Sequence, residues 1–147
     1  MSSFSQRKKN RAVRAALVGT AGFVAFWAGA GAIGLIGGGV DLGAEITARL
    51  PFQSPIFAGT ALALLVGAPM TATAVLALRS HPAAAPTAMA GGTILLGWVV
   101  MQPFIIGQVS WMQAVFGVLG TAVGALGFRL ARFRTGTPTG LARPAVA

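Results

Sequence analysis

Apolar residues fill four long stretches of this 147-residue chain, and short polar segments separate them. The stretches cover residues 15–40, 56–78, 88–106 and 109–128, and no Asp, Glu, Lys, Arg or His interrupts any of them. A helix of about 20 residues rises about 30 Å, which is the thickness of the hydrocarbon core of a bilayer. The pattern therefore predicts an all-α fold, a bundle of four transmembrane helices.

A shorter amphipathic segment follows the first stretch, between Asp41 and Pro55. Its apolar residues recur every four positions, at Leu42, Ile46 and Leu50. Glu45 and Arg49 have the i,i+4 spacing of a helical ion pair, and Pro51 is the expected stop. This spacing predicts a short helix that lies in the membrane interface and does not cross the bilayer.

The two ends of the chain lack this apolar pattern. Residues 1–14 form a basic segment, and we expect the first ten of them to be disordered. Residues 131–147 become rich in Thr, Gly and Pro, which predicts a flexible tail. Residues 15–130 between them form the predicted transmembrane domain. Its last two spans are joined by a short connection around residues 107–110, which forces an antiparallel hairpin.

The composition excludes a water-soluble fold. Hydrophobic residues make up 55% of the chain and charged residues only 9%, whereas a soluble domain carries about 25% charged residues. The net charge of +9 would indicate nucleic-acid binding in a soluble protein. Here ten of the eleven basic residues flank the predicted spans, so we expect the bilayer as partner and no nucleic acid.

The placement of these basic residues predicts the orientation. Only Arg49 falls on the side opposite the other Lys and Arg residues, so the positive-inside rule places both termini in the cytoplasm, in a multi-pass protein of the cell (inner) membrane. The topology determinants are Arg7, Lys8, Lys9, Arg11, Arg14, Arg129, Arg132 and Arg134. The N-terminus also has the layout of a signal peptide, but its apolar run continues to Val40, so we expect it to be retained.

Small residues repeat along the predicted helices at spacings that place them on one face. The fourth span carries Gly117, Gly120, Gly124 and Gly127, and the second carries Gly59, Ala63 and Gly67. In lipid no hydrophobic force drives helices together, so close backbone approach at small residues is a main source of association. These helix-packing faces either pack the bundle internally or bind another membrane protein or a second copy of the chain.

Proline interrupts two of the spans. Pro69 and Pro103 each leave the carbonyl four residues earlier without its helical partner, so each helix should kink or open locally. Thr71 and Thr73, or a neighbouring helix, are candidates to satisfy the freed carbonyls. Discontinuous helices form some transporter sites, but a simple kink is the commoner outcome.

Glutamines and tryptophans are the remaining features of the spans. Gln102 and Gln113 lie equally far from the midpoint of the last hairpin, which predicts a hydrogen bond between the two helices. Together with Gln108 they form a candidate outer polar cluster that could line a shallow cavity. Trp27 and Trp98 fall near the middle of their spans, where packing or lipid contact explains them better than a ligand site.

The groups that are missing exclude several chemistries. An ionisable residue within the membrane is the usual sign of proton coupling, and none of the spans has one. The single histidine, His81, lies in a predicted loop, whereas a bis-histidine haem needs two. The acidic residues Asp41 and Glu45 belong to one helix surface, and no cysteine or metal-ligand spacing occurs. We therefore expect no catalytic residues, metal, cofactor or enzymatic activity.

Two segments resemble known proteins. RLPFQSPIFAGTALALLVGAPM (Arg49 to Met70) and GWVVMQPFIIGQVSWMQ (Gly97 to Gln113) resemble small, uncharacterised four-helix integral membrane proteins of actinobacteria. The resemblance covers residues 40–128 and rests on general pattern, so it implies a class and a source but no site residues.

Two functions remain in view. The small-residue faces and the lack of reactive groups favour a non-enzymatic membrane protein that acts through helix–helix contacts, as an accessory or assembly subunit of a larger cell-envelope complex. The alternative is a small oligomeric channel or permease for an uncharged or lipid-like solute, motivated by the prolines and the outer glutamines.

Overall fold

The chain folds into helices joined by short turns, in an all-α arrangement. The computed structural model describes residues 3–107 and 109–135. Its elements are α1 (Ser3–Ile36), α2 (Gly43–Arg49), the 3-10 turn η1 (Pro51–Gln53), α3 (Pro55–Leu62), the π-helical turn η2 (Ala63–Gly67), α4 (Ala68–Leu78), α5 (Ala84–Ile106) and α6 (Trp111–Thr135). The segment α3–η2–α4 is one continuous helical run, interrupted only by the wider turn of η2.

Within these described residues, four helical segments are long and apolar enough to cross a membrane. They cover Ser5–Ile36, Pro55–Leu78, Ala84–Ile106 and Trp111–Phe133. The helical character of the four apolar stretches is therefore confirmed.

The bounds of the first and last helices differ from the sequence prediction. The expectation of disorder over the first ten residues is wrong from Ser3 onward, because Gln, Arg and Lys, which make up half of residues 3–10, are good helix formers and α1 extends through them. At its other end α1 stops at Ile36, where Gly37, Gly38 and Gly39 follow and Gly38 takes a left-handed φ of 69°. Helix α6 continues to Thr135, and residues 136–147 of the predicted tail lie outside the described residues.

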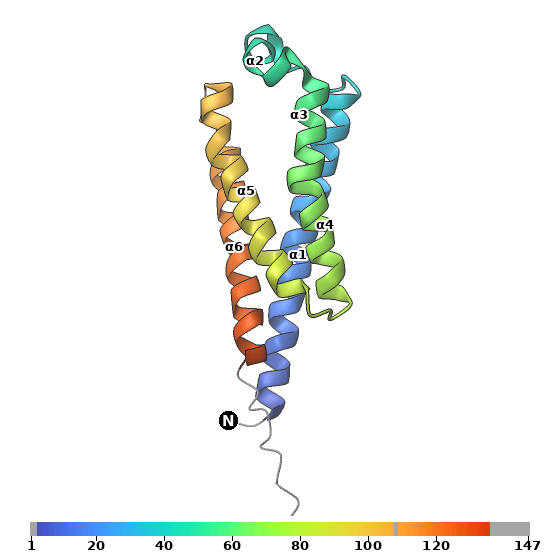
Figure 1. Ribbon diagram of the computed structural model, residues 1–147, viewed down its shortest axis with the longest axis vertical. Coiled ribbons are helices and arrows are strands. Elements are labelled where there is room, and N and C mark those ends of the chain that lie inside the picture. Colours follow the sequence, from blue (N-terminus) through green and yellow to red (C-terminus); the bar gives the residue numbers. More distant parts are fainter. Residues whose placement is uncertain (1–2, 108, 136–147) are drawn as a thin grey trace, which may run out of the picture.

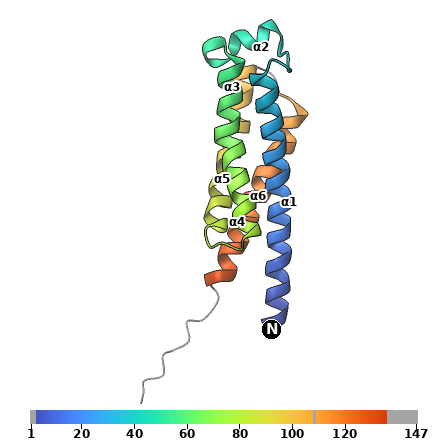
Figure 2. The ribbon, with the colours of Figure 1, turned by 90° about the vertical axis from the view of Figure 1, so that its right-hand side faces the viewer.

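The helices form two antiparallel hairpins (Figure 1). Helix α1 packs along α3, η2 and α4, and α5 packs along α6. Helix α1 also contacts α6, and α4 contacts α5, so the four long helices close a ring. The ring lies at the end of the bundle that holds the start of α1 and the end of α6, and we call this end of the bundle the terminal end. Toward the opposite end, the α2 end, α5 leans away from α3, and α2 lies across the top of the bundle (Figures 1 and 2).

Buried side chains of modest size hold the ring together. On α1 the buried residues repeat every three or four positions, as Leu17, Ala21, Val24, Ala28 and Ala32, so one face of the helix meets its neighbours. Met70 and Leu130, from α4 and α6, are fully buried against this face in the same cluster. The start of α5 joins the same cluster through Ala84, Ala85 and Ala88. Alanine occupies little space, so α5 can approach the other helices closely there.

The α5–α6 hairpin depends on backbone contact at glycine. A Cβ added at Gly92 would lie 2.7 Å from both the carbonyl oxygen of Gly120 and the amide nitrogen of Gly124. One at Gly127 would lie 2.8 Å from the Cβ of Ala88. The two helices can approach this closely only because these positions lack a side chain.

The two prolines inside the long apolar helices behave differently. The local opening predicted near Pro69 is confirmed, because η2 ends two residues before it and the Ala68 N–H donates to the carbonyl of Ala63, five residues back. Around Pro103, α5 remains one continuous helix. Thr71 and Thr73 each donate to the carbonyl four residues before them at 2.8 Å, so they do not satisfy the carbonyl that Pro69 frees.

The predicted amphipathic helix is present as α2. Glu45 and Arg49 form the expected ion pair at 3.1 Å, and Leu50 is buried just after the helix ends. A Cβ at Gly107 would overlap the Arg49 guanidinium, so the end of α2 rests directly on the end of α5. This contact joins the two hairpins across the α2 end, where their helices have separated.

Candidate functional site

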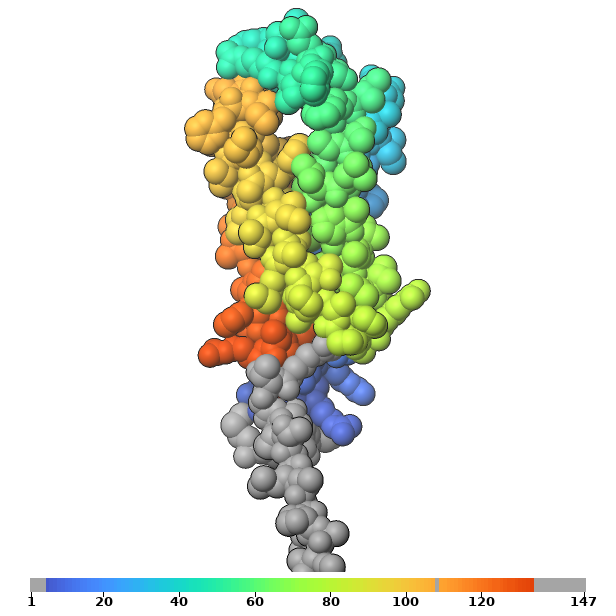
Figure 3. All heavy atoms as spheres, in the orientation of Figure 1, coloured from blue at the N-terminus to red at the C-terminus, as the bar shows by residue number. Residues whose placement is uncertain are grey.

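A cavity of about 530 Å³ lies between the two hairpins in the half of the bundle nearest α2. Residues of α1, α3, η2, α5 and α6 line it, with Val40 contributed by the loop after α1. Figure 3 shows the hollow as an opening between α3 and α5 directly below α2. The cavity exists because helices that pack tightly at the terminal end diverge before α2 reconnects them.

The wall of this cavity is apolar. Its aliphatic and aromatic side chains include Phe23, Leu62, Val66, Leu95, Val99, Met112, Val115 and Phe116. Among the described residues that line it, none is ionisable, and Gln102 contributes the one side-chain amide. A charged molecule would find no compensating charge here, so the lining selects an uncharged one.

All three tryptophans of the chain meet at this cavity. Trp27 comes from α1, Trp98 from the middle of α5 and Trp111 from the start of α6. Trp27 also makes edge-to-face contacts with Phe23 and Phe26, at ring-centroid distances of 6.3 and 5.8 Å. The mid-span positions of Trp27 and Trp98 are visible in the sequence, but the space that they share depends on how the helices pack.

Trp98 lines the cavity, and its indole N–H is buried and has no hydrogen-bond partner in the described part of the chain. A buried donor without an acceptor costs about 1–3 kcal/mol, and such groups are rare in native structures. An indole can only donate, so the group that would relieve the cost is an acceptor oxygen or nitrogen. The cavity lined by the same indole ring has room for a molecule that carries such an acceptor.

The predicted glutamine cluster is only partly assembled. Gln102 lines the cavity, and Gln113 is buried at the start of α6, where its side-chain oxygen accepts a hydrogen bond from the Ser110 N–H at 3.1 Å. A bond between Gln102 and Gln113 is not among the contacts that the structure gives to the described residues. Gln108, the third member, lies outside those residues.

Most members of the small-residue faces point into the molecule, but a Cβ added at Gly124 would meet nothing within 4 Å. A Cβ added at Gly117 would lie 3.8 Å from Cγ1 of Val99, and one at Gly120 would lie 3.2 Å from Cγ of Leu95, both on α5. In the other hairpin the face meets α1, since a Cβ at Gly59 would lie 3.0 Å from the carbonyl oxygen of Ala32. The remaining members of that face are Gly67, which is buried, and Ala63, which is half-buried. These contacts favour internal packing over binding of a second protein through the same faces.

The groups with reactive or charged side chains lie away from the cavity. His81 is exposed in the loop before α5, where its Nδ1 accepts from the Ala83 N–H at 3.2 Å. Asp41 and Glu45 are exposed at the α2 end, and the described residues contain no grouping of His, Asp and Glu able to hold a metal ion. The predicted topology determinants lie on α1 and α6 at the terminal end, although the side chain of Arg134 is outside the described set.

Comparison with known proteins adds no assignment. No protein-family model, curated protein or solved structure matches this chain. The resemblance to small actinobacterial membrane proteins therefore stays a prediction, and the function has to be argued from the cavity and its lining.

Proposed function

We propose that this is a multi-pass membrane protein that holds one uncharged, lipid-like molecule between its two helical hairpins and acts through contacts, without catalysis. The observation that carries the proposal is the apolar cavity lined by Trp98, whose buried indole N–H has no partner among the described residues. Its volume, about 530 Å³, falls in the range of small-molecule sites, roughly 300–1,000 Å³.

The outer surface supports a location in the bilayer. Large apolar side chains cover the outward-facing sides of the helices, as with Ile33, Phe104 and Val118, which are 74%, 80% and 69% exposed. A protein in water rarely exposes so much contiguous apolar surface. The basic residues of α1 and α6 lie at the terminal end and α2 at the other, which supports cytoplasmic termini and an α2 that rests in the outer interface.

The chemistry of the wall specifies the ligand. An apolar body is needed because the lining is apolar, and a net charge is disfavoured because no ionisable side chain lines the described wall. At least one acceptor is needed for Trp98, such as the carbonyl oxygen of an ester or a ketone. The hollow between α3 and α5 faces sideways, so a molecule dissolved in the bilayer would enter without crossing water (Figure 3).

This proposal joins the two functions that the sequence left open. A molecule held at the side of the bundle can be presented to another membrane protein, which is how an accessory subunit would use it. A channel gains less support, because Leu17, Met70 and Leu130 are fully buried in the terminal half and fill the space through which the cavity would have to continue. The ligand class, uncharged and lipid-like, is the same one that the alternative named.

Intrinsic fluorescence gives a direct test because every tryptophan lines the cavity. Purified protein in detergent is titrated with a brominated fatty-acid methyl ester, which carries a carbonyl, and with a brominated alkane of equal length, which does not. We expect saturable quenching by both and tighter binding of the ester. In Trp98→Phe the advantage of the ester should fall about fivefold, the equivalent of one hydrogen bond of about 1 kcal/mol.

The matched control is Trp111→Phe, which removes an indole N–H from the exposed mouth of the same cavity, where the side chain is 75% exposed. The control should keep the preference for the ester. Quenching that never saturates, or an equal loss in both variants, would contradict the proposal. Extraction of the native protein from membranes by alkaline carbonate would separately refute the membrane location.

A further inference from the structure

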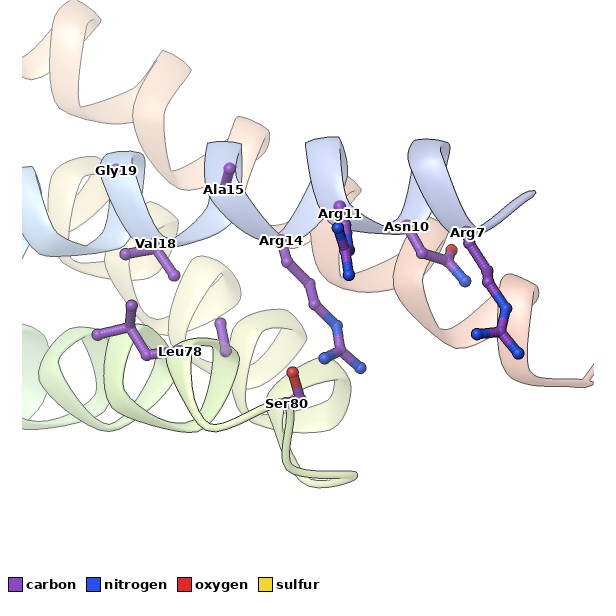
Figure 4. Close-up of a pocket in the computed structure, with 10 residues that line it drawn as sticks. Arg7, Asn10, Arg11, Arg14, Ala15, Val18, Gly19, Leu78 and Ser80 are labelled. Atoms are coloured by element: carbon purple, nitrogen blue, oxygen red, sulfur yellow. The ribbon is translucent and has the colours of Figure 1, made fainter. Parts of the chain in front are cut away.

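A second hollow, of about 670 Å³, lies at the terminal end between the start of α1 and the end of α4. We call it the basic groove. Arg7, Asn10, Arg11 and Arg14 line it from α1, and Ser80 lines it from the turn after α4. In Figure 4 these side chains lie on the same side of α1, in the order Arg7, Asn10, Arg11 and Arg14, and Arg14 extends toward Ser80. The three arginines are four and three residues apart, so they lie on one face of the helix.

The charge of this groove is not balanced within the chain. The sequence has only two acidic residues, Asp41 and Glu45, and both lie at the opposite, α2 end of the bundle. Arg7 and Arg11 stand at i,i+4 spacing on α1, where like charges repel. An anion from outside the chain would relieve this repulsion.

Polar groups beside the arginines fit the same kind of ligand. Asn10 lines the groove, and its side-chain amide carries two N–H donors. The Ser80 hydroxyl also faces the groove. Guanidinium groups bind phosphate through paired N–H donors, so three arginines with an amide and a hydroxyl form a set suited to a phosphate.

The other wall of the basic groove is apolar. Ala15, Val18 and Gly19 continue along α1 beyond Arg14, and Ala77 and Leu78 face them from α4. Figure 4 shows Val18 and Leu78 side by side next to the charged part. Charge therefore gives way to apolar surface along α1 in the direction of the bundle centre, as phosphate gives way to acyl chain in a phospholipid.

We propose that the basic groove binds the phosphate of an anionic phospholipid on Arg7, Arg11 and Arg14 and the first part of its acyl chain on Val18 and Leu78. The proposal rests on the membrane location argued above, but it is independent of the cavity near α2. A free phosphate would use the arginines alone, so the apolar wall favours the lipid.

The first test removes charge from the groove and, in a control, from beside it. Purified protein in a neutral detergent is titrated with short-chain phosphatidylglycerol, and bound lipid is counted by native mass spectrometry. Arg11→Gln with Arg14→Gln should weaken binding about tenfold, because two charge-assisted contacts are lost. Lys8→Gln with Lys9→Gln removes the same charge from the same helix but not from the groove lining, and should change the affinity less than about twofold.

The second test leaves the charge unchanged and fills the apolar wall. Gly19 lines the groove and has nothing within 4 Å of an added Cβ, so Gly19→Leu can fold and occupy the acyl-chain position. Gly22→Leu is the matched control, since Gly22 also has nothing within 4 Å but does not line the groove. We expect several-fold weaker phosphatidylglycerol binding in the first variant only, with circular dichroism unchanged in both.

Three results would overturn the lipid site. They are equal weakening by the arginine and lysine pairs, binding of phosphatidylcholine as tight as that of phosphatidylglycerol, and displacement of the lipid by millimolar inorganic phosphate, which would assign the groove to a free anion. Tryptophan quenching by the brominated ester should persist in the arginine variant. If that quenching persists while lipid binding at the groove fails, only the proposed lipid site is refuted. Release of the protein by alkaline carbonate would refute the membrane location, on which the cavity proposal and the lipid site both depend.

Discussion

Adding a single methyl group at Gly92 should separate α5 from α6. Its Cβ would lie 2.7 Å from the Gly120 carbonyl oxygen and the Gly124 amide nitrogen, about 0.7 Å short of the 3.4 Å at which ordinary contact begins. All of these neighbours are backbone atoms, which cannot rotate away as a side chain can. In Gly92→Ala the two helices must therefore move apart at their closest point.

The expected cost follows from two opposing effects. Overpacking of this kind costs about 1–3 kcal/mol, because a gap of 0.5–1 Å forfeits a quarter to a half of each neighbouring dispersion contact. Alanine is also a better helix former than glycine, which stabilises the folded state by about 0.5–1 kcal/mol. We expect a net loss of roughly 1–2 kcal/mol in the free energy of unfolding, by combining these estimates.

The measurement is unfolding in mixed micelles as the fraction of a denaturing detergent is raised, followed by circular dichroism. Gly97→Ala, on the same helix, and Gly124→Ala, on the opposing one, are the controls, since an added Cβ at either position meets nothing within 4 Å. Both should be neutral or slightly stabilising. If Gly92→Ala proved as stable as these controls, the close α5–α6 contact would be wrong.

Other positions give further expected outcomes. Leu17→Ala, at a side chain with no exposed surface, should lower the unfolding free energy by about 2 kcal/mol or more in the same assay, whereas Phe26→Ala, 68% exposed, should change it by less than about 1 kcal/mol. Glu45→Gln breaks an ion pair whose side chains are 73% and 49% exposed, so a change above about 1 kcal/mol would contradict its surface character. A fluorescent reporter fused after the C-terminus should fold in the cytoplasm, and a periplasmic location would refute the orientation.

The helices themselves were predictable because their signals are local. Uninterrupted apolar runs indicate helices of spanning length, and the i,i+4 placement of Glu45 and Arg49 indicates α2. The opening before Pro69 was also predictable, since proline removes a backbone donor. The start of α1 was missed because a polar, charged segment suggests disorder, although its individual residues favour helix.

The two candidate sites were less predictable from the sequence than the helices were. Arg7, Arg11 and Arg14 share one face of a helix at recognisable spacing, but only the position of the turn at Ser80 makes that face a groove. The spacing of the glutamine pair predicts a bridge between two helices, yet Gln113 turns to the backbone of Ser110, a partner that lies in the turn before its own helix. Such choices depend on distances between segments, which periodicity does not encode.

Four apolar helices, a short amphipathic one and a strong asymmetry of charge can be read from the amino-acid sequence, because each depends on residues close together in the chain. The tertiary structure alone decided that α5 and α6 touch at Gly92 and that the hairpins diverge toward α2, and hence that Trp27, Trp98 and Trp111 surround one cavity. The angle between packed helices depends on which small residues touch across the interface. The sequence does not show which glycine of α5 lies against α6, whereas the structure places Gly92 in that contact and leaves Gly97 outside it.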